Sequence, residues 1–318
     1  MRSLAIALVL FVASIGCRNS PDRNTTVSTA TLPALPPSPQ TPQAPQTQVG
    51  PGWHWVNPTP QGNALWSVVA NPECGIVAAG EESTVMRSTD DGATWTTHQS
   101  DDRWRFKSAA LFGTTLYAVG DGSNGSVLVS IANCGDGEQK TIRKLDTKTD
   151  GSANAVAVDA QGRIFLTTVL HAHGKILCSK PGETDLAVCD DLPNQPFYGL
   201  FIDKSGRVFA AGGYQGALGG IVRRSSDHGA TWKTVGQHLG SIAYGIWGDA
   251  DGKRLFATGS SSLYSSSDGG VSWITTPVPI ARGGSMMLGT GDAPYVPNDF
   301  STFVFGSADT GTFFVAGG

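Results

Sequence analysis

The chain has 318 residues, including 41 Gly and 18 Pro, and only 15% of its residues are charged. Its formal net charge of −4 provides no basic field to attract phosphate backbones, so nucleic acid is excluded as an expected partner. Abundant Gly with β-branched and aromatic residues favours many short strands joined by tight turns. Beyond the N-terminal apolar run, no stretch approaches the roughly 20 apolar residues that span a bilayer.

The N-terminus has the pattern of an export signal. Arg2 precedes the apolar run LAIALVLFVASIG, which ends at Cys17. The sequence SIGC resembles a bacterial lipobox, although Ser14 stands where Leu is usual. The resemblance implies that residues 1–16 are a lipoprotein signal peptide and that acylated Cys17 attaches the chain to a lipid bilayer. An ordinary cleaved signal, in which Cys17 has no role, is the alternative.

Residues 17–50 combine the predicted lipidated cysteine with a Pro-, Thr- and Gln-rich segment. This segment has no periodic apolar pattern and cannot bury a core, which predicts a disordered tether. Arg18, not Asp, follows the cysteine, so nothing favours retention at an inner membrane. We therefore expect an exported protein anchored in the bacterial cell envelope, in the outer membrane if the cell is Gram-negative.

The remainder, residues 51–318, is built from repeats. Apolar runs recur at intervals of 41 to 47 residues: LWSVVA from Leu65, FKSAAL from Phe106, ANAVAV from Ala153, FYGLFI from Phe197, AYGIWG from Ala243 and SMMLGT from Ser285. A second apolar run follows each of them. This spacing predicts an all-β, six-bladed β-propeller with four-stranded blades. The opening strand Trp53–Asn57 is expected to complete the last blade and close the ring.

Three octapeptides, STDDGATW, SSDHGATW and SSDGGVSW, share the pattern Ser-x-Asp-x-Gly-x-Thr/Ser-Trp. They resemble the Asp-box, or bacterial neuraminidase repeat, of several propeller families. The opening run WHWVNPTPQGNALWSV also resembles the start of propellers related to photosystem II assembly factors. In the expected turn, the Asp accepts backbone N–H groups, the Gly adopts positive φ and the Trp packs between blades. The residues given this structural role are Ser88, Asp90, Gly92, Trp95, Ser225, Asp227, Gly229, Trp232, Ser266, Asp268, Gly270 and Trp273.

Four cysteines follow Cys17, and an even number in an exported protein suggests disulfides. Cys178 and Cys189 flank a plausible hairpin in the unit that lacks the octapeptide. A disulfide there could stabilise the hairpin in place of the missing octapeptide and its Trp. Cys74 and Cys134 fall in turns of adjacent units on the same face, so a bridge between them is geometrically possible. Four free thiols are the alternative.

A candidate ligand face is expected at the end of the first strands that lies opposite the octapeptide turns. The second position of each first-strand run holds Trp66, Lys107, Asn154, Tyr198, Tyr244 and Met286. Large aromatic residues there are either core or the wall of a binding cleft. The expected ligand face comprises Trp66, Lys107, Tyr198, Tyr244, His171, His173 and Tyr214.

These features favour a non-enzymatic binding or scaffolding propeller, expected to be monomeric and to need no cofactor. Its ligand would be a protein segment, a glycan or a cell-wall component. A sialidase-like glycosidase is the alternative, but the Arg-Ile-Pro run expected near its first blade is absent from the sequence. His171 and His173 could share one face of a strand, but no third ligand follows at a recognisable spacing, so no metal site is predicted.

Overall fold

The computed structural model describes residues 62–123, 125–214, 219–259 and 262–277, together with the backbone of 303–307 and 312–316. All of these residues belong to one compact unit. No helix in this part of the chain has the length and apolar character needed to cross a bilayer. The predicted signal peptide and tether, with Cys17, lie outside the described residues.

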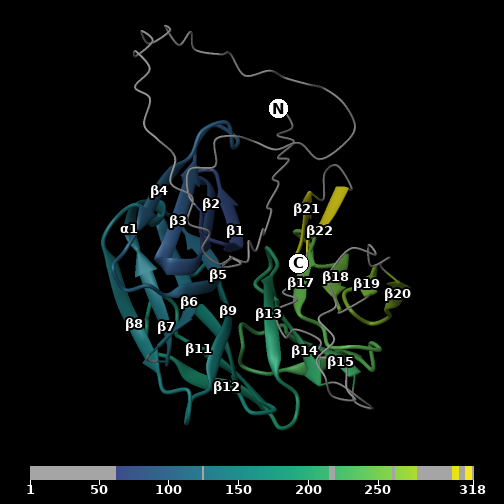
Figure 1. Ribbon diagram of the computed structural model, residues 1–318. Helices are drawn as coiled ribbons and strands as arrows, with labels where there is room; N and C mark the ends of the chain where they lie inside the picture. The colour runs from purple at the N-terminus through teal and green to yellow at the C-terminus, as the bar shows by residue number, and fades with distance from the viewer. Residues whose placement is uncertain are drawn as a thin grey trace, which may run out of the picture. The chain divides into compact units, whose positions relative to one another are not determined.

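The fold is all-β, with five antiparallel sheets of four strands that follow one another in chain order (Figure 1). Each sheet is one blade, and its strands are neighbours in sequence order. The strands of the first three blades are β1 (Leu65–Asn71), β2 (Gly75–Gly80), β3 (Thr84–Ser88) and β4 (Thr96–Gln99); β5 (Arg105–Phe112), β6 (Thr115–Gly122), β7 (Gly125–Ile131) and β8 (Gln139–Leu145); and β9 (Ser152–Val158), β10 (Ile164–Leu170), β11 (His173–Cys178) and β12 (Ala187–Leu192).

The strands of the fourth and fifth blades are β13 (Phe197–Ile202), β14 (Val208–Tyr214), β15 (Gly219–Ser225) and β16 (Lys233–Gln237), and β17 (Gly245–Gly248), β18 (Leu255–Thr258), β19 (Ser262–Ser266) and β20 (Ile274–Pro277). Two single turns connect strands: the 3-10 helix η1 (Glu81–Ser83) lies between β2 and β3, and the segment α1 (Ala132–Gly135) lies between β7 and β8. The first strands of successive blades lie side by side, which makes them the inner strands of the propeller.

The blade number corrects the sequence prediction: the propeller has five blades, and six is wrong. Among the described residues, the sixth repeat contributes a two-stranded sheet, β21 (Phe303–Ser307) paired with β22 (Thr312–Ala316). The repeat spacing counts apolar runs, whereas a blade requires four strands joined by hydrogen bonds. The expected first strand of this unit, SMMLGT, and the expected closing strand Trp53–Asn57 lie outside the described residues.

The hydrophobic core lies between blades. Each cluster joins neighbours: Val77 of β2 with Phe106 of β5 in one, and Phe209 of β14 with Leu255 of β18 in another. The second strands β2 and β14 are almost wholly buried, which explains their continuous apolar runs, whereas the outer strand β20 is exposed along its whole length. Because the blades are buried against one another on both faces, polar side chains can gather at the ends of the inner strands.

The three octapeptides form the same turn between the third and fourth strands of blades 1, 4 and 5. In blade 4, the Ser225 hydroxyl accepts the Gly229 N–H at 2.7 Å and donates to Asp227 at 2.8 Å. The Asp227 carboxylate also accepts the backbone N–H of Thr231 at 2.8 Å and its hydroxyl at 2.5 Å. Gly229 has φ of +90°, and a Cβ there would lie 3.0 Å from the sulfur of Cys178, so only glycine fits.

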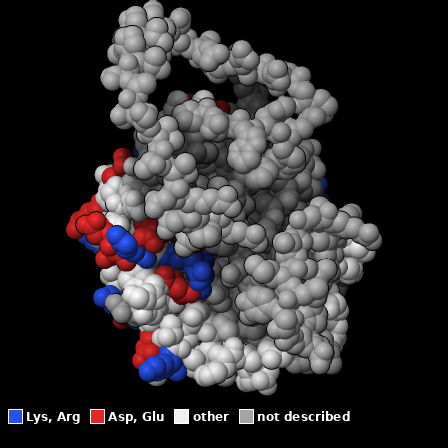
Figure 2. Space-filling model, in the orientation of Figure 1, with Lys and Arg blue, Asp and Glu red and all other residues white. Residues whose placement is uncertain are grey.

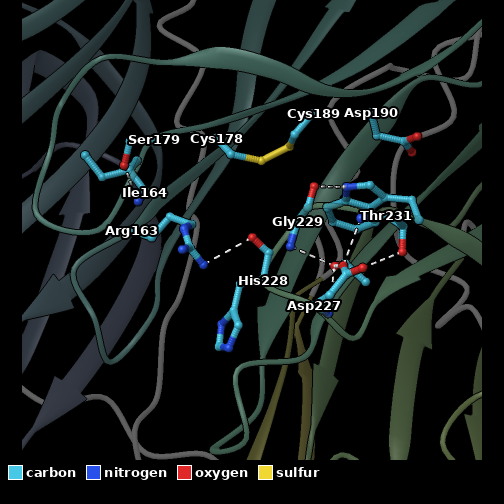
Figure 3. Close-up of a disulfide and its surroundings, with 12 residues drawn as sticks. Arg163, Ile164, Cys178, Ser179, Cys189, Asp190, Asp227, His228, Gly229 and Thr231 are labelled. Carbon is cyan, nitrogen blue, oxygen red and sulfur yellow. Dashed lines mark hydrogen bonds between the residues drawn. A yellow bond between two sulfur atoms is a disulfide. The ribbon is translucent and has the colours of Figure 1, made fainter.

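Both disulfides considered from the sequence are present, Cys74–Cys134 and Cys178–Cys189. Strand register pairs Cys178 with Ala187, and a bulge in β12 carries Cys189. Trp232, from the next blade, packs against the same buried cluster as these two cysteines, and Figure 3 shows the Asp227 turn beside the bridge. Disulfides persist in oxidising compartments, which agrees with the prediction that the protein is exported.

Candidate functional site

Four consecutive inner strands carry a β-bulge at the same position. In β1, for example, Leu65 pairs with Gly80 and Ser67 pairs with Ala79, so Trp66 has no partner of its own. The same register shift leaves Lys107, Asn154 and Tyr198 as the extra residue in the next three blades. Tyr244 immediately precedes β17, the inner strand of blade 5. We call these five residues the bulge ring: Trp66, Lys107, Asn154, Tyr198 and Tyr244.

A β-bulge bends its strand and redirects a side chain, and bulges are over-represented next to active and binding sites. The bulge ring therefore corresponds to the second position of each first-strand apolar run in the sequence. The bulge supplies the structural reason why this position differs from its neighbours. Period-2 alternation places alternate residues on alternate faces, but it does not reveal an extra residue. The signal available in the sequence was the alignment of the repeats themselves.

The Lys107 ammonium contacts groups of its own blade, blade 2, and of the neighbouring blade 3. Its ammonium forms an ion pair with Asp121 on β6 and donates to the Ala153 carbonyl at 3.1 Å and to the Asn154 side chain at 3.4 Å. An ammonium has three donors, and here each has an acceptor. Lys107 therefore links blade 2 to blade 3, and its charge is balanced by Asp121.

Asn154 continues this connection to blade 4. Its amide nitrogen donates to the carbonyl of Phe197 at 3.3 Å, while its amide oxygen accepts from Lys107. The bulge ring is thus a chain of contacts from one inner strand to the next. In this half of the ring, the polar side chains hold neighbouring blades together.

The next part of the ring is aromatic. The rings of Tyr198 and Tyr244 meet with centroids 5.4 Å apart and planes tilted by 50°. Burial, together with smaller contributions from the nearby Tyr244 and Tyr214, raises the pKa of Tyr198 to about 12. Tyr214 ends β14 and is half exposed. Three tyrosines predicted to share a face are therefore neighbours, and the Tyr198 hydroxyl stays protonated at physiological pH.

Buried polar atoms without hydrogen-bond partners gather at the same strand ends. Within the described part of the chain, the indole nitrogens of Trp66 and Trp104 and the amide oxygen of Gln195 have no partner. Trp104 directly precedes β5, and Gln195 lies just before β13. Buried polar groups are nearly always satisfied, and an unsatisfied one costs about 1–3 kcal/mol. The fourth such atom, on His228, lies in a turn at the other end of the strands.

The two remaining residues of the expected ligand face lie in and directly after the turn between β10 and β11. His171 lies in the turn between β10 and β11 with φ of +57°, and His173 pairs with Asp191 on β12. In the described ranges, no three side chains of the His, Cys, Asp or Glu type are arranged to hold a metal ion.

The opposite ends of the strands carry arginines that are engaged in turns. Arg207 forms an ion pair at 2.6 Å with buried Asp203 within one turn. Arg163 lies 3.5 Å from buried Asp159 and donates to the His228 carbonyl of the next blade at 3.2 Å, the contact drawn in Figure 3. These two arginines hold turns in place and do not form a carboxylate clamp.

Charge is evenly mixed where it can be seen. Figure 2 shows Lys and Arg side chains interspersed with Asp and Glu on the described part of the visible face. Several exposed charges of the described residues form ion pairs, among them Lys204 with Asp251 and Arg103 with Glu82.

Comparison with known proteins rests on structure, because no family model and no curated protein matches the sequence. The extracellular domain of the hybrid two-component system BT4673 from B. thetaiotaomicron superposes with a TM-score of 0.56 at 12% identity, covering 84% of this chain and 33% of that one. Hydrazine synthase of Kuenenia stuttgartiensis gives a TM-score of 0.52 at 12% identity and 70% coverage of both chains. The chain is similar in fold to both.

The chain is a β-propeller. Identities this low show the fold and nothing more. YCF48 from Cyanidioschyzon merolae is also similar, at 14% identity over 69% of this chain and 87% of that one, but its TM-score of 0.46 supports no inference. The function must therefore be argued from the residues of this chain.

Proposed function

We propose that this protein is an exported, lipid-anchored binding propeller that holds its ligand on the tyrosine part of the bulge ring. The observation that carries the proposal is the recurrence of the bulge at one position in four consecutive inner strands. A repeated bulge redirects one side chain per blade to the same end of the propeller. A binding or scaffolding role, not catalysis, follows from the chemistry gathered there.

The available groups suit recognition. Tyrosine offers an apolar ring with a polar tip, a combination enriched at binding surfaces. The Tyr198–Tyr244 pair and half-exposed Tyr214 supply this surface, while Lys107 and Asn154 fix the blades beneath it. The bulge ring contains no carboxylate, so it lacks both the carboxylate pair of most glycoside hydrolases and the acid that accompanies the tyrosine nucleophile of sialidases.

The cellular location in this proposal comes from the N-terminal sequence. Acylation of Cys17 within SIGC would anchor the chain, and residues 18–50 would hold the propeller away from the lipid surface. Substitution of Cys17→Ser is expected to abolish labelling by a radioactive fatty acid and to release the chain from the detergent phase. Unchanged partitioning of this variant into detergent would refute the lipid anchor without touching the binding site.

Photo-crosslinking tests the site. Benzoylphenylalanine is placed at Tyr214, which is 50% exposed, or at Val188 on the outer strand β12, which is 53% exposed, in the full chain in a bacterial envelope. Position 188 is the control, because it is about as exposed as position 214 but lies on an outer strand. We expect a discrete adduct from position 214 that disappears with Tyr198→Ala and Tyr244→Ala. Equal labelling from both positions would place the ligand elsewhere.

A further inference from the structure

The tyrosine part of the bulge ring lies at an uncharged end of blades 4 and 5. The four connections between strands at this end contain no Asp, Glu, Lys or Arg, and their one imidazole belongs to His238. These connections are residues 193–196, 215–218, 238–244 and 259–261. At the opposite end of the same two blades, each connection contains at least one Asp, and these connections are residues 203–207, 226–232, 249–254 and 267–273. A ligand with net charge therefore finds no carboxylate, ammonium or guanidinium partner in the connections around the tyrosines.

Gln195 adds an acceptor that has no donor. The Gly213 N–H donates to the Pro196 carbonyl at 2.9 Å. Continuing this antiparallel pairing by one residue sets Gln195 opposite Tyr214. The Gln195 side chain is half-buried, and its amide oxygen has no hydrogen-bond partner within the described ranges. Because the terminal torsion of glutamine is soft, this oxygen can turn towards a ligand that brings a hydroxyl or N–H donor.

The backbone around the tyrosines is already paired. The Tyr244 N–H donates to the Thr258 carbonyl at 2.7 Å. The Ala243 N–H donates to the Gly212 carbonyl at 3.0 Å. A polypeptide that adds a strand to a sheet gains its affinity from free backbone groups, and these groups are engaged. Recognition at this end therefore depends on side chains, which here are aromatic or neutral and polar.

We propose that the tyrosine part of the bulge ring binds an uncharged saccharide, with a pyranose ring packed on Tyr214 and a sugar hydroxyl donating to Gln195. The C–H groups on the face of a pyranose pack against the negative face of an aromatic ring, and the Tyr214 ring is half exposed. Sugar hydroxyls both donate and accept hydrogen bonds, as tyrosine hydroxyls do. The Tyr198 hydroxyl keeps its proton, because burial raises its pKa to about 12. This inference rests on the proposed function and names the ligand class of the same site.

The first test presents the full chain in detergent to an array of neutral oligosaccharides. Each neutral member is paired with an acidic derivative that carries a uronic or sialic acid. We expect neutral members to bind and their acidic partners to bind more weakly, because the connections around the tyrosines provide no cation to balance a carboxylate.

The second test measures affinity by titration calorimetry with the neutral array member that binds most tightly. Tyr214→Ala should weaken binding at least about tenfold, which is typical when a central aromatic contact is removed. Gln195→Leu should weaken it about five- to tenfold, which corresponds to the loss of one hydrogen bond. The melting temperature should not fall with Gln195→Leu, because the amide oxygen has no partner in the free protein. The matched control is Phe112→Ala, a 39% exposed aromatic residue at the other end of the strands, which should leave affinity within about twofold.

The remaining outcomes overturn the inference in distinguishable ways. If acidic glycans bind more tightly than their neutral partners, or if no glycan binds, the uncharged saccharide is refuted. Crosslinking at position 214 then judges the site separately, and a polypeptide adduct there would identify the other ligand class. Sugar binding that is unaffected by Tyr214→Ala and Gln195→Leu would refute the placement of the sugar at this end. Gln195→Met serves as a second variant should Gln195→Leu fail to fold.

Discussion

The guanidinium of Arg163 donates to the carbonyl of His228, 3.2 Å away in the next blade, although 65 residues separate them in sequence. The Cys74–Cys134 bridge joins the β1–β2 turn of blade 1 to the β7–β8 turn of blade 2. In both cases a turn between first and second strands is tied to the turn between third and fourth strands of the following blade. One end of the propeller is therefore fastened by these contacts, which leaves the tyrosine part of the bulge ring, at the other end, available for binding.

This arrangement predicts that Arg163→Met destabilises the fold. The Asp159 side chain is only 1% exposed, and the change leaves its charge without the arginine. Breaking a buried pair costs about 3–5 kcal/mol, but Asp159 keeps backbone donors, so we expect about 2–3 kcal/mol. Denaturant unfolding measures this loss. Adding Asp159→Asn should recover part of it, and a double variant as unstable as Arg163→Met would contradict the account.

The two disulfides should contribute unequally. Cys74–Cys134 closes a loop with a sequence separation of 60, and Cys178–Cys189 one of 11. Loop entropy predicts about 4.3 and about 2.8 kcal/mol respectively. Replacing each pair with Ala and comparing unfolding free energies tests the order. A larger loss from the short loop would show that the packing of Cys178 and Cys189 in their buried cluster outweighs loop entropy.

Acid stability should depend on the three turn aspartates. Hydrogen bonds from Thr94, Thr231 and Ser272 lower the pKa of Asp90, Asp227 and Asp268 from 3.8 to about 2. Folding thus favours the ionised carboxylates, and their stabilisation is fully present above about pH 4 and is lost as the pH falls towards 2. Melting temperatures over this range should fall less steeply when all three are changed to Asn. Identical slopes would exclude this contribution.

Much of the fold could be predicted from the sequence because the apolar runs of the repeats coincide with the strands that are buried between blades. Apolar runs such as GIVAAG mark strands buried between blades, and the spacing of Cys178 and Cys189 marked a hairpin. The number of blades could not be predicted, because the repeat spacing cannot show that β21 and β22 form a sheet of two strands.

The candidate site was predicted only in outline. Aligning the repeats placed Tyr198 and Tyr244 at equivalent positions, and the structure brings their rings into contact. Nothing in the sequence indicates that Lys107 pairs with Asp121, because their approach depends on the bulge in β5 at Lys107. Pairing of this kind arises from register, which only the folded sheet determines.

The central claim is that ligand binding and fold stability depend on opposite ends of the strands. The direct measurement pairs affinity for the molecule crosslinked at position 214 with the melting temperature of each variant. Tyr198→Ala and Tyr244→Ala should weaken binding at least about tenfold with little loss of melting temperature. Trp232→Ala should lower the melting temperature by about 5–10 °C, through a cavity costing about 2–3 kcal/mol, and leave affinity unchanged. The reverse pattern, with binding lost in Trp232→Ala and retained in the tyrosine variants, would contradict the account.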